Sequence, residues 1–233
     1  MTIRRADLPL TASMGYAVAV ETSLISRAMA ARILLVLLGA ATMPARAGDQ
    51  WSDPFRGVRY LHRTTASPKW SIHVTVIDLA APGIRFAATT PDGKRATVGS
   101  FARRKKVQVA VNGDFFNLDT RVPVCYAMGE GVHWPGTSDN KEFCGQVAIG
   151  GNRVELIAPE ADFQHEPWMR EVVGGHPAIL RDGQAVNQGD YTLKPRHPRT
   201  AVGLSRDNRR LFLLVVDGRQ SHSVGMTGAK SPA

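Results

Sequence analysis

Alternating β-branched residues in short runs, each closed by a turn signal, are the feature that most limits what this chain can fold into. Ile72, Val74 and Val76 occupy every second position between residues 71 and 79, which is the period of a β-strand. Pro82-Gly83 follows and ends the run. We predict further strands from similar runs at 57–63, 84–90, 107–111, 146–149, 153–157, 178–181, 200–205 and 210–216.

Only one segment has a clear helical pattern. Thr97 is placed to cap a short helix that runs to Lys106, and Val98, Phe101 and Ala102 share its apolar face. Of the 233 residues, 43% are hydrophobic and 21% are charged, which is ordinary for a folded protein and excludes a wholly disordered one. The expected fold class is therefore α+β, a single β-sheet-dominated domain with a few short helices.

An apolar run at 33–41 predicts an export signal near the start of the chain. It is too short to cross a bilayer, which takes about 20 apolar residues. Two arginines precede it and Ala45-Arg46-Ala47 follows as a small-x-small cleavage site. We expect residues 1–47 to be a signal peptide, so that the mature chain is periplasmic or secreted and has no transmembrane segment. A start at Met29 would give the signal a charged region of ordinary length, and a buried core helix is the alternative interpretation.

The chain has two cysteines, Cys125 and Cys144. An exported protein meets an oxidising compartment, so we expect a disulfide between them. A loop of this length would stabilise the fold by about 3 kcal/mol. Two buried free thiols are the alternative. Neither the cysteines nor the histidines have the spacing of a metal site, so no metal is predicted, and the sequence indicates no particular cofactor.

The net charge of +9 does not point to nucleic acid. Residues 1–47 hold five arginines and two acids, which leaves +6 for the rest of the chain. The remaining basic residues form short groups such as 103–106 rather than one stripe, which is a weak footprint for a nucleic-acid partner.

Three polar clusters lie at the ends of apolar strands. They are Asn112-Gly113-Asp114 after 107–111, His197-Pro198-Arg199-Thr200 before 201–204, and Asp217-Gly218-Arg219 after 211–216. Each alone is typical of a turn, since Asn-Gly and Asp-Gly are common turn dipeptides. However, Phe115-Phe116 is not a polar loop exit, so the first cluster does not have the sequence of a simple hairpin.

Together the clusters supply two carboxylates, Asp114 and Asp217, and two guanidinium groups, Arg199 and Arg219. Pairs of carboxylates cleave glycosidic bonds, one as an acid and the other as a base or nucleophile. Arginine recognises phosphate through paired hydrogen bonds. A site that holds both predicts a substrate in which a sugar is attached through phosphate.

The chain also resembles the phosphodiester glycosidase family over roughly residues 70–227. The resemblance rests on ordered blocks: Asn112-Gly113-Asp114-Phe115-Phe116, Gly174-Gly175-His176-Pro177-Ala178-Ile179-Leu180 with Asp182-Gly183, Pro198-Arg199-Thr200-Ala201-Val202-Gly203, Asp217-Gly218-Arg219, and Ser223-Val224-Gly225-Met226-Thr227. It implies that Asp114 and Asp217 are catalytic. It also implies a pocket for a sugar phosphate or polysaccharide, lined by Asn112, Gly113, Gly174, Gly175, Arg199, Thr200, Gly218 and Arg219. Bacterial members of that family are often described as exported proteins related to exopolysaccharide, so the resemblance also implies export.

Family members continue after the last of these blocks into a helix and a strand that ends in an Asp-Gly-Gly-Gly-Ser loop. Here Thr227 is followed only by residues 228–233, a polar tail without that pattern. The resemblance therefore implies an incomplete domain at 71–227, truncated at its C-terminal side. A lead-in segment at 48–70 would precede it.

Three functional interpretations follow from these features. The first is an exported hydrolase that cleaves a sugar-1-phosphodiester, of the N-acetylglucosamine-1-phosphodiester kind, into free sugar and phosphomonoester. The second is a non-catalytic exported factor that binds glycan or polysaccharide in exopolysaccharide biosynthesis. The third is an inactive truncated remnant.

Overall fold

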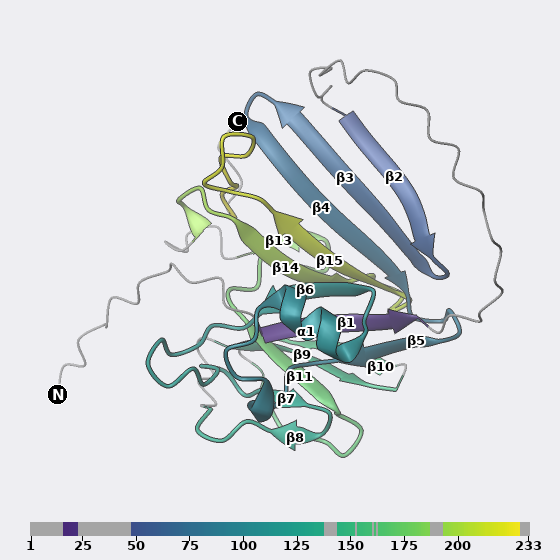
Figure 1. Cartoon of the computed structure of the whole chain (residues 1–233), viewed down its shortest axis with the longest axis vertical. Coiled ribbons are helices and arrows are strands. Elements are labelled where there is room, and N and C mark those ends of the chain that lie inside the picture. The colour runs from purple at the N-terminus through teal and green to yellow at the C-terminus, as the bar shows by residue number, and fades with distance from the viewer. Residues whose placement is uncertain are drawn as a thin grey trace.

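The computed structural model describes residues 16–22, 48–137, 144–151, 153–159, 161, 163–186 and 193–228. This part of the chain is built mainly from β-strands, with one α-helix and one 3₁₀ turn (Figure 1). The prediction of a sheet-dominated fold is confirmed, although the described residues hold a single α-helix rather than a few. None of the described residues forms a helix that is long and apolar enough to cross a membrane.

The largest sheet joins strands from residues 48–78 to strands from residues 199–216. Its five antiparallel strands run in the order β14-β15-β4-β3-β2. They are β2 (Gly48–Phe55), β3 (Val58–Ala66), β4 (Lys69–Asp78), β14 (Arg199–Leu204) and β15 (Arg210–Val216). The strands expected at 71–79, 200–205 and 210–216 are therefore present. The lead-in segment contributes two complete strands, whereas the sequence suggested only one.

A second sheet runs in the order β10-β9-β11-β7-β8. Its members are β7 (Met128–Gly129), β8 (Val132–His133), β9 (Gly145–Gly150), β10 (Arg153–Ile157) and β11 (Glu171–Gly175). The strands expected at 146–149 and 153–157 are present as β9 and β10, and they pair with each other as an antiparallel hairpin. A separate small hairpin pairs β12 (Leu180–Arg181) with β13 (Gln184–Ala185).

The third sheet has β1 (Tyr16–Thr22) in the middle, between β5 (Ile84–Ala87) and β6 (Val109–Gly113). The strand expected at 84–90 ends at Ala87. The reason is that the Ala88 N–H donates 2.8 Å to Glu171 Oε2 instead of to a neighbouring strand. A 3₁₀ turn, η1 (Pro91–Gly93), then begins.

The expected helix is α1 (Val98–Lys105), and it covers the outer side of this third sheet. The Thr97 hydroxyl accepts a hydrogen bond from the Ser100 N–H at 3.2 Å, as an N-cap should. Phe101 is fully buried against Ala87 and Ala110. The prediction of a capped helix is confirmed.

Within the range predicted as a signal peptide, the structure describes only β1; residues 1–15 and 23–47, including the apolar run, lie outside the described residues. Of the predicted tail, only Gly228 is described. The domain boundaries inferred from the sequence remain predictions.

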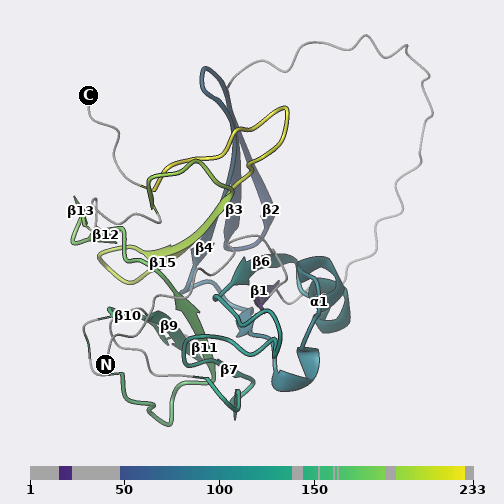
Figure 2. The same ribbon diagram turned by 90° about the vertical axis from the view of Figure 1, so that its left-hand side faces the viewer.

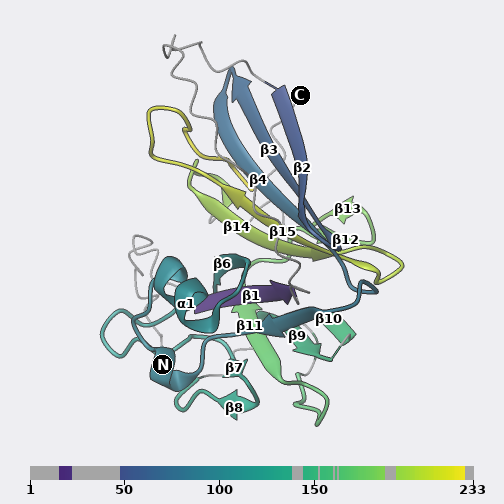
Figure 3. The same cartoon turned by 45° about the vertical axis from the view of Figure 1, so that its right-hand side comes forward.

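The main core lies where the three sheets meet. Ile77 and Leu211 reach it from the five-stranded sheet, Val147 and Ile149 from the second sheet, and Ile84 from the third. Burying each such side chain stabilises the fold by roughly 1.5–3 kcal/mol. Figures 2 and 3 show that β2, β3 and β4 extend well beyond the other two sheets. The part of the five-stranded sheet that carries polar residues therefore continues past the apolar core.

Candidate active site

On one face of the largest sheet, the apolar core residues give way to polar side chains towards one end of the strands. Thr200, Val215, His73 and His62 lie opposite one another on four neighbouring strands, β14, β15, β4 and β3. Two positions further along the strands, Leu213 is part of the core. Because side chains two apart share one face of a sheet, this row continues the core-facing side.

Asp217 directly follows β15, two positions beyond Val215, and therefore lies on the same face of the sheet. Its Oδ2 lies 3.3 Å from His73 Nε2 and 3.4 Å from His222 Nε2, and its backbone N–H donates to the Ser71 carbonyl at 3.0 Å. Burial acts to raise the pKa of Asp217, but hydrogen bonds from Ser71, His73 and His222 outweigh it and hold that pKa below its ordinary value. The Asp217 carboxylate is therefore ionised at neutral pH.

The histidines around Asp217 were missed by the sequence analysis. The Tyr60 hydroxyl lies 2.6 Å from His73 Nδ1, and the His62 ring stacks on the His73 ring with centroids 4.6 Å apart. Burial and the nearby charge of Asp217 raise the pKa of Tyr60. The alternation of 71–79 places Ser71 and His73 on one face, but only the pairing of β4 with the distant β15 brings that face to Asp217.

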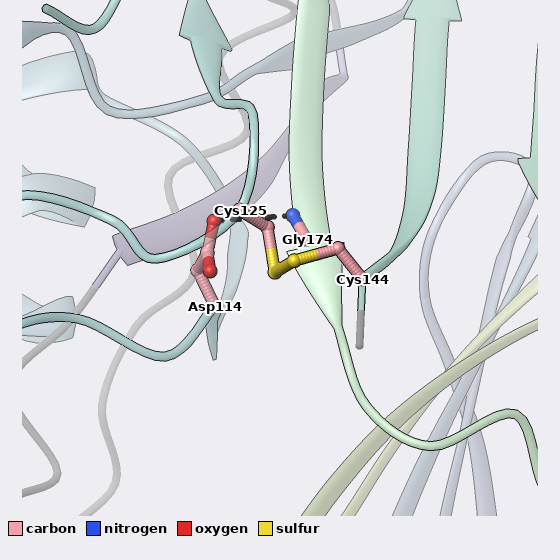
Figure 4. Close-up of a disulfide and its surroundings, with 4 residues drawn as sticks. All are labelled: Asp114, Cys125, Cys144 and Gly174. Carbon is pink, nitrogen blue, oxygen red and sulfur yellow. Dashed lines mark hydrogen bonds between the residues drawn. A yellow bond between two sulfur atoms is a disulfide. The ribbon is translucent and has the colours of Figure 1, made fainter. Parts of the chain in front are cut away.

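Asp114 lies in a different environment, directly after β6. Its φ is 54°, a left-handed conformation that aspartate tolerates better than most residues. The Gly174 N–H donates to Oδ2 at 3.2 Å, while Oδ1 is buried with no hydrogen-bond partner among the described residues (Figure 4). Burial raises the pKa of Asp114 to about 7, although backbone N–H groups of Gly174, Phe115 and Cys125 oppose that rise. A substantial fraction of this carboxyl group is protonated at neutral pH.

A disulfide between Cys125 and Cys144 borders Asp114, which confirms the predicted pairing (Figure 4). Both cysteines are buried. A Cβ added at Gly174 would overlap Cys125 Cβ and come within 3.1 Å of Asp114 Oδ1, whereas a Cβ at Gly175 would meet nothing within 4 Å. Gly174 is thus required for close packing beside Asp114, while Gly175 is not constrained in this way.

The second and third polar clusters lie against each other. Arg219 Nη2 donates to His197 Nδ1 at 3.0 Å, and a Cβ at Gly218 would overlap the Pro198 backbone. Burial lowers the pKa of His197, and the charges of Arg219 and Arg199 lower it further. His197 therefore accepts from Arg219 as a neutral ring, and this corner of the site carries positive charge.

Arg199 is partly used for structure. Its Nε donates to the Met226 carbonyl at 3.1 Å and its Nη2 donates to the Pro195 carbonyl at 2.8 Å. These bonds attach the start of β14 to the segments before and after it in the chain. Arg219 is exposed, so its guanidinium is more accessible to a bound anion.

The first cluster is joined to the second by one hydrogen bond. The Thr200 hydroxyl donates to Asn112 Oδ1 at 2.6 Å, which connects β14 to the end of β6. Asn112 and Gly113 are the last residues of β6 rather than part of a hairpin turn, because β6 runs to Gly113. Asp114 and Asp217 share no hydrogen bond. Among the described residues, no group of three or more potential ligands is arranged to hold a metal ion.

Comparison with known proteins bears on this arrangement. A family model described as phosphodiester glycosidase matches residues 105–231, which is more than half of the chain. The chain belongs to the phosphodiester glycosidase family. The matched range contains all three polar clusters and both cysteines. A search of curated proteins found no match to this chain.

We predict that alanine at Gly174 destabilises the protein far more than alanine at Gly175. A methyl group at Gly174 has to displace the disulfide or Asp114, which we expect to lower the free energy of unfolding by about 1–3 kcal/mol. Gly175→Ala meets open space, and its effect should stay within about 0.5 kcal/mol. Urea unfolding of both variants tests this. Equal destabilisation would contradict the packing around Gly174.

We predict that the free energy of unfolding falls as pH rises, because two carboxyl groups are buried. Burial raises the pKa of Asp114 and of Glu171 to about 7, from 3.8 and 4.5, and Glu171 Oε2 accepts the Ala88 and Glu130 N–H groups. Between about pH 4.5 and 7 the folded state therefore binds more protons than the unfolded state. We expect the free energy of unfolding to fall by about 2–4 kcal/mol per group across this window, at about 1.4 kcal/mol per pKa unit.

Urea unfolding at pH 5 and pH 8 measures this effect in three variants. Asp114→Asn and Glu171→Gln should each remove part of the decline, and the exposed Asp119→Asn should leave it unchanged. A decline that persists at full size in Asp114→Asn would show that its carboxyl is not protonated in the folded protein.

Proposed function

We propose that this chain hydrolyses a sugar-1-phosphodiester at the bond between the sugar and the phosphate oxygen. The observation that carries the proposal is the opposite displacement of two carboxyl pKa values, Asp114 upward and Asp217 downward. Glycosidic cleavage needs one protonated and one ionised carboxyl group at the same pH. The membership of the phosphodiester glycosidase family supports this class of reaction.

In this proposal Asp114 is the general acid and Asp217 is the base or nucleophile. Asp114 gives its proton to the phosphate oxygen as the bond from the sugar C1 atom to that oxygen breaks. Water supplies the hydroxyl group at C1 by one of two routes: either Asp217 takes a proton from the water as it attacks C1, or Asp217 first bonds to C1 and Asp114, now ionised, takes the proton of the water that displaces Asp217. The products are the free sugar and a phosphomonoester. His73 and His222 keep Asp217 ionised, and Tyr60 fixes the His73 ring by bonding its other nitrogen.

The phosphate group fits the positive corner formed by His197, Arg199 and Arg219. Arg219 is exposed and already oriented by His197, so we assign it the direct contact with phosphate. Arg199 adds charge while holding the start of β14 in place. The sugar would bind between this corner and Asp114. The residues assigned to it are the exposed Thr200 and the backbone of Asn112, Gly113 and Gly218, because Thr200 bonds Asn112 and Gly113 directly precedes Asp114.

We further infer that the protein acts outside the cytoplasm, on a polysaccharide or glycan phosphate. The Cys125–Cys144 disulfide supports this inference because such bonds persist in oxidising compartments. The signal pattern at 33–47 supports it independently of the disulfide. The identity of the sugar follows the family resemblance, which suggests N-acetylglucosamine.

Replacement of either aspartate tests the proposed roles. With methyl N-acetylglucosamine-1-phosphate as substrate, we expect Asp217→Asn and Asp114→Asn each to lower kcat by about 10²–10⁴-fold, the usual contribution of a positioned acid or base. Free sugar released is the quantity measured, and circular dichroism confirms folding. Asp119→Asn is the matched control and should keep full activity.

The outcomes of this assay separate the candidate functions. Full turnover by Asp217→Asn would remove Asp217 from the mechanism. A wild-type protein that binds the diester, as measured by calorimetry, without releasing sugar would indicate the glycan-binding factor instead.

The positive corner yields a prediction that does not depend on turnover. Removing the charge of Arg219 should raise the pKa of His197 toward its ordinary value of 6.5, because that charge and burial lower it. Titration of the His197 ring protons by NMR in wild type and Arg219→Gln measures the change. Arg206→Gln, in the turn between β14 and β15, is the control, and an unchanged His197 pKa in Arg219→Gln would contradict the contact.

A further inference from the structure

Ser71 and His62 lie on the polar face of the largest sheet, and the proposed reaction assigns neither of them a role. Ser71 is on β4, two positions before His73, and His62 of β3 is directly opposite His73. His62 and Ser71 are therefore diagonal neighbours on one face of the sheet. Their side chains are in contact, because His62 Nε2 is 3.2 Å from Ser71 Oγ.

The backbone of Ser71 is fixed to Asp217 independently of its side chain. The Asp217 N–H donates to the Ser71 carbonyl at 3.0 Å, and the Ser71 N–H donates to Ser223 Oγ at 3.1 Å. The Ser223 hydroxyl in turn donates to the Asp217 carbonyl at 2.6 Å. Both serines are buried. The Ser71 hydroxyl is thus held near Asp217, and only the direction of its O–H bond is left to be decided.

Three polar groups surround the Ser71 hydroxyl and decide that direction. Oγ is 3.2 Å from His62 Nε2 and 3.1 Å from His73 Nε2, and a hydrogen bond from Ser71 lowers the pKa of Asp217. An ionised carboxylate can only accept hydrogen bonds, so the single Ser71 proton points to Asp217. The two lone pairs of Oγ are then left for the two histidine nitrogens, and both nitrogens have to carry a hydrogen atom.

The same constraint fixes the tautomer of His73. Its Nε2 faces both Ser71 Oγ and the Asp217 carboxylate, 3.3 Å away, so this nitrogen has to be the N–H donor. In a neutral imidazole the other nitrogen is then an acceptor. The Tyr60 hydroxyl, 2.6 Å from Nδ1, therefore donates to His73. The hydrogen bonds of this cluster thus run towards Asp217 from both sides.

His62 has two routes by which it can act on Asp217. The first is the hydrogen bond to Ser71, and the second is the stack of its ring on the His73 ring, with centroids 4.6 Å apart and planes at 6°. The first route sets the direction of a hydrogen bond to the carboxylate, whereas the second involves no hydrogen bond. The lone pairs of Ser71 therefore favour the first route.

We propose that His62 is a positioning residue for Asp217 and acts through Ser71, because its Nε2–H holds the Ser71 oxygen so that the Ser71 hydroxyl donates to the carboxylate. This role rests on the proposed function, in which Asp217 is the base or nucleophile. Neither His62 nor Ser71 contacts the reacting atoms in this arrangement.

The titration of the Asp217 carboxyl group reports this contact. The titratable side chains that face the carboxylate are His73 of β4 and His222 of the segment after β15. Tyr60 of β3 is close enough for the Asp217 charge to raise the pKa of Tyr60. All three are kept in the variants below, so a change in the Asp217 pKa has to come from His62 or Ser71.

NMR titration of the Asp217 carboxyl carbon tests the proposal without any turnover, and the signal is assigned by its loss in Asp217→Asn. We expect Ser71→Ala to raise the pKa of Asp217 by about 1–2, because a hydrogen bond to a charged group is lost. His62→Phe keeps a flat ring over His73 but has no N–H, and it should raise the pKa by a smaller amount. The exposed His165→Phe is the control and should leave that pKa unchanged.

A double-mutant cycle separates the two routes from His62 to Asp217. If His62 acts through Ser71, His62→Phe should cause no further change in the Asp217 pKa when Ser71→Ala is already present. The same rise with and without Ser71 would overturn the proposal. An unchanged Asp217 pKa in His62→Phe alone would also overturn it.

His62→Gln tests whether an N–H donor is sufficient. The glutamine amide can donate to Ser71 Oγ but has no imidazole ring, so the Asp217 pKa should return close to its wild-type value. A His62→Gln variant that behaves like His62→Phe would contradict the proposal. Circular dichroism confirms folding, and this comparison decides the question even if Ser71→Ala does not fold.

The pH dependence of kcat/KM on methyl N-acetylglucosamine-1-phosphate gives a second measurement. Its acid side reports the pKa of the essential base in the free protein, so it should move to higher pH in His62→Phe and return in His62→Gln. An acid side that stays in place in an active His62→Phe variant would overturn the positioning role. NMR changes as expected, in a protein that releases no sugar, would uphold the effect of His62 on Asp217 and reject the proposed reaction.

Discussion

The pairing of β4 with β15 organises both the core and the candidate site. These strands are hydrogen-bonded from Arg210–Asp78 to Val216–Ile72, although most of the chain lies between them. At one end of the pair, Ile77 and Leu211 are fully buried and anchor the apolar core. At the other end, the same register places His73 beside Asp217. The register of this one strand pair therefore determines which end carries buried apolar residues and which end carries the polar site. A shift of the register by one residue would move His73 to the opposite face of the sheet.

The two candidate carboxyl groups obtain different protonation states from different kinds of neighbour. Asp217 has imidazole and hydroxyl groups around it, which stabilise its negative charge. Asp114 has a disulfide, a close glycine and one unpaired buried oxygen, so its charged form is poorly stabilised. Neither state follows from the aspartate itself. The two pKa values differ because the residues lie at the ends of different strands. Asp114 follows β6 and is buried in the packed interior, whereas Asp217 follows β15 and lies on a polar face.

Local patterns in the sequence predicted local structure well. The strand at 71–79, the Thr97 cap and the strands at 146–149 and 153–157 each depend on residues that are close together in the sequence, and the structure shows all of them. The polar clusters were also identified, and the contacts of Thr200 with Asn112 and of Arg219 with His197 bring them together. The histidine partners of Asp217 could not be found in this way. His73 lies in an ordinary alternating strand, and its role depends on a pairing partner about 140 residues away.

The same reasoning explains why the segment at 16–22 was not recognised as part of the sheet. Its alternation of alanine and valine is short, and the nearby apolar run at 33–41 gives a stronger signal for export. Its place in the fold is visible only from the pairing of β1 with β5 on one side and with β6 on the other, and both strands are distant from it in the sequence. β1 pairs with Asn112 and Gly113, the two residues that precede Asp114, so it also supports the backbone that carries this carboxyl group. β1 and the candidate acid Asp114 are therefore connected through β6, and a change in β1 would act first on Asn112 and Gly113.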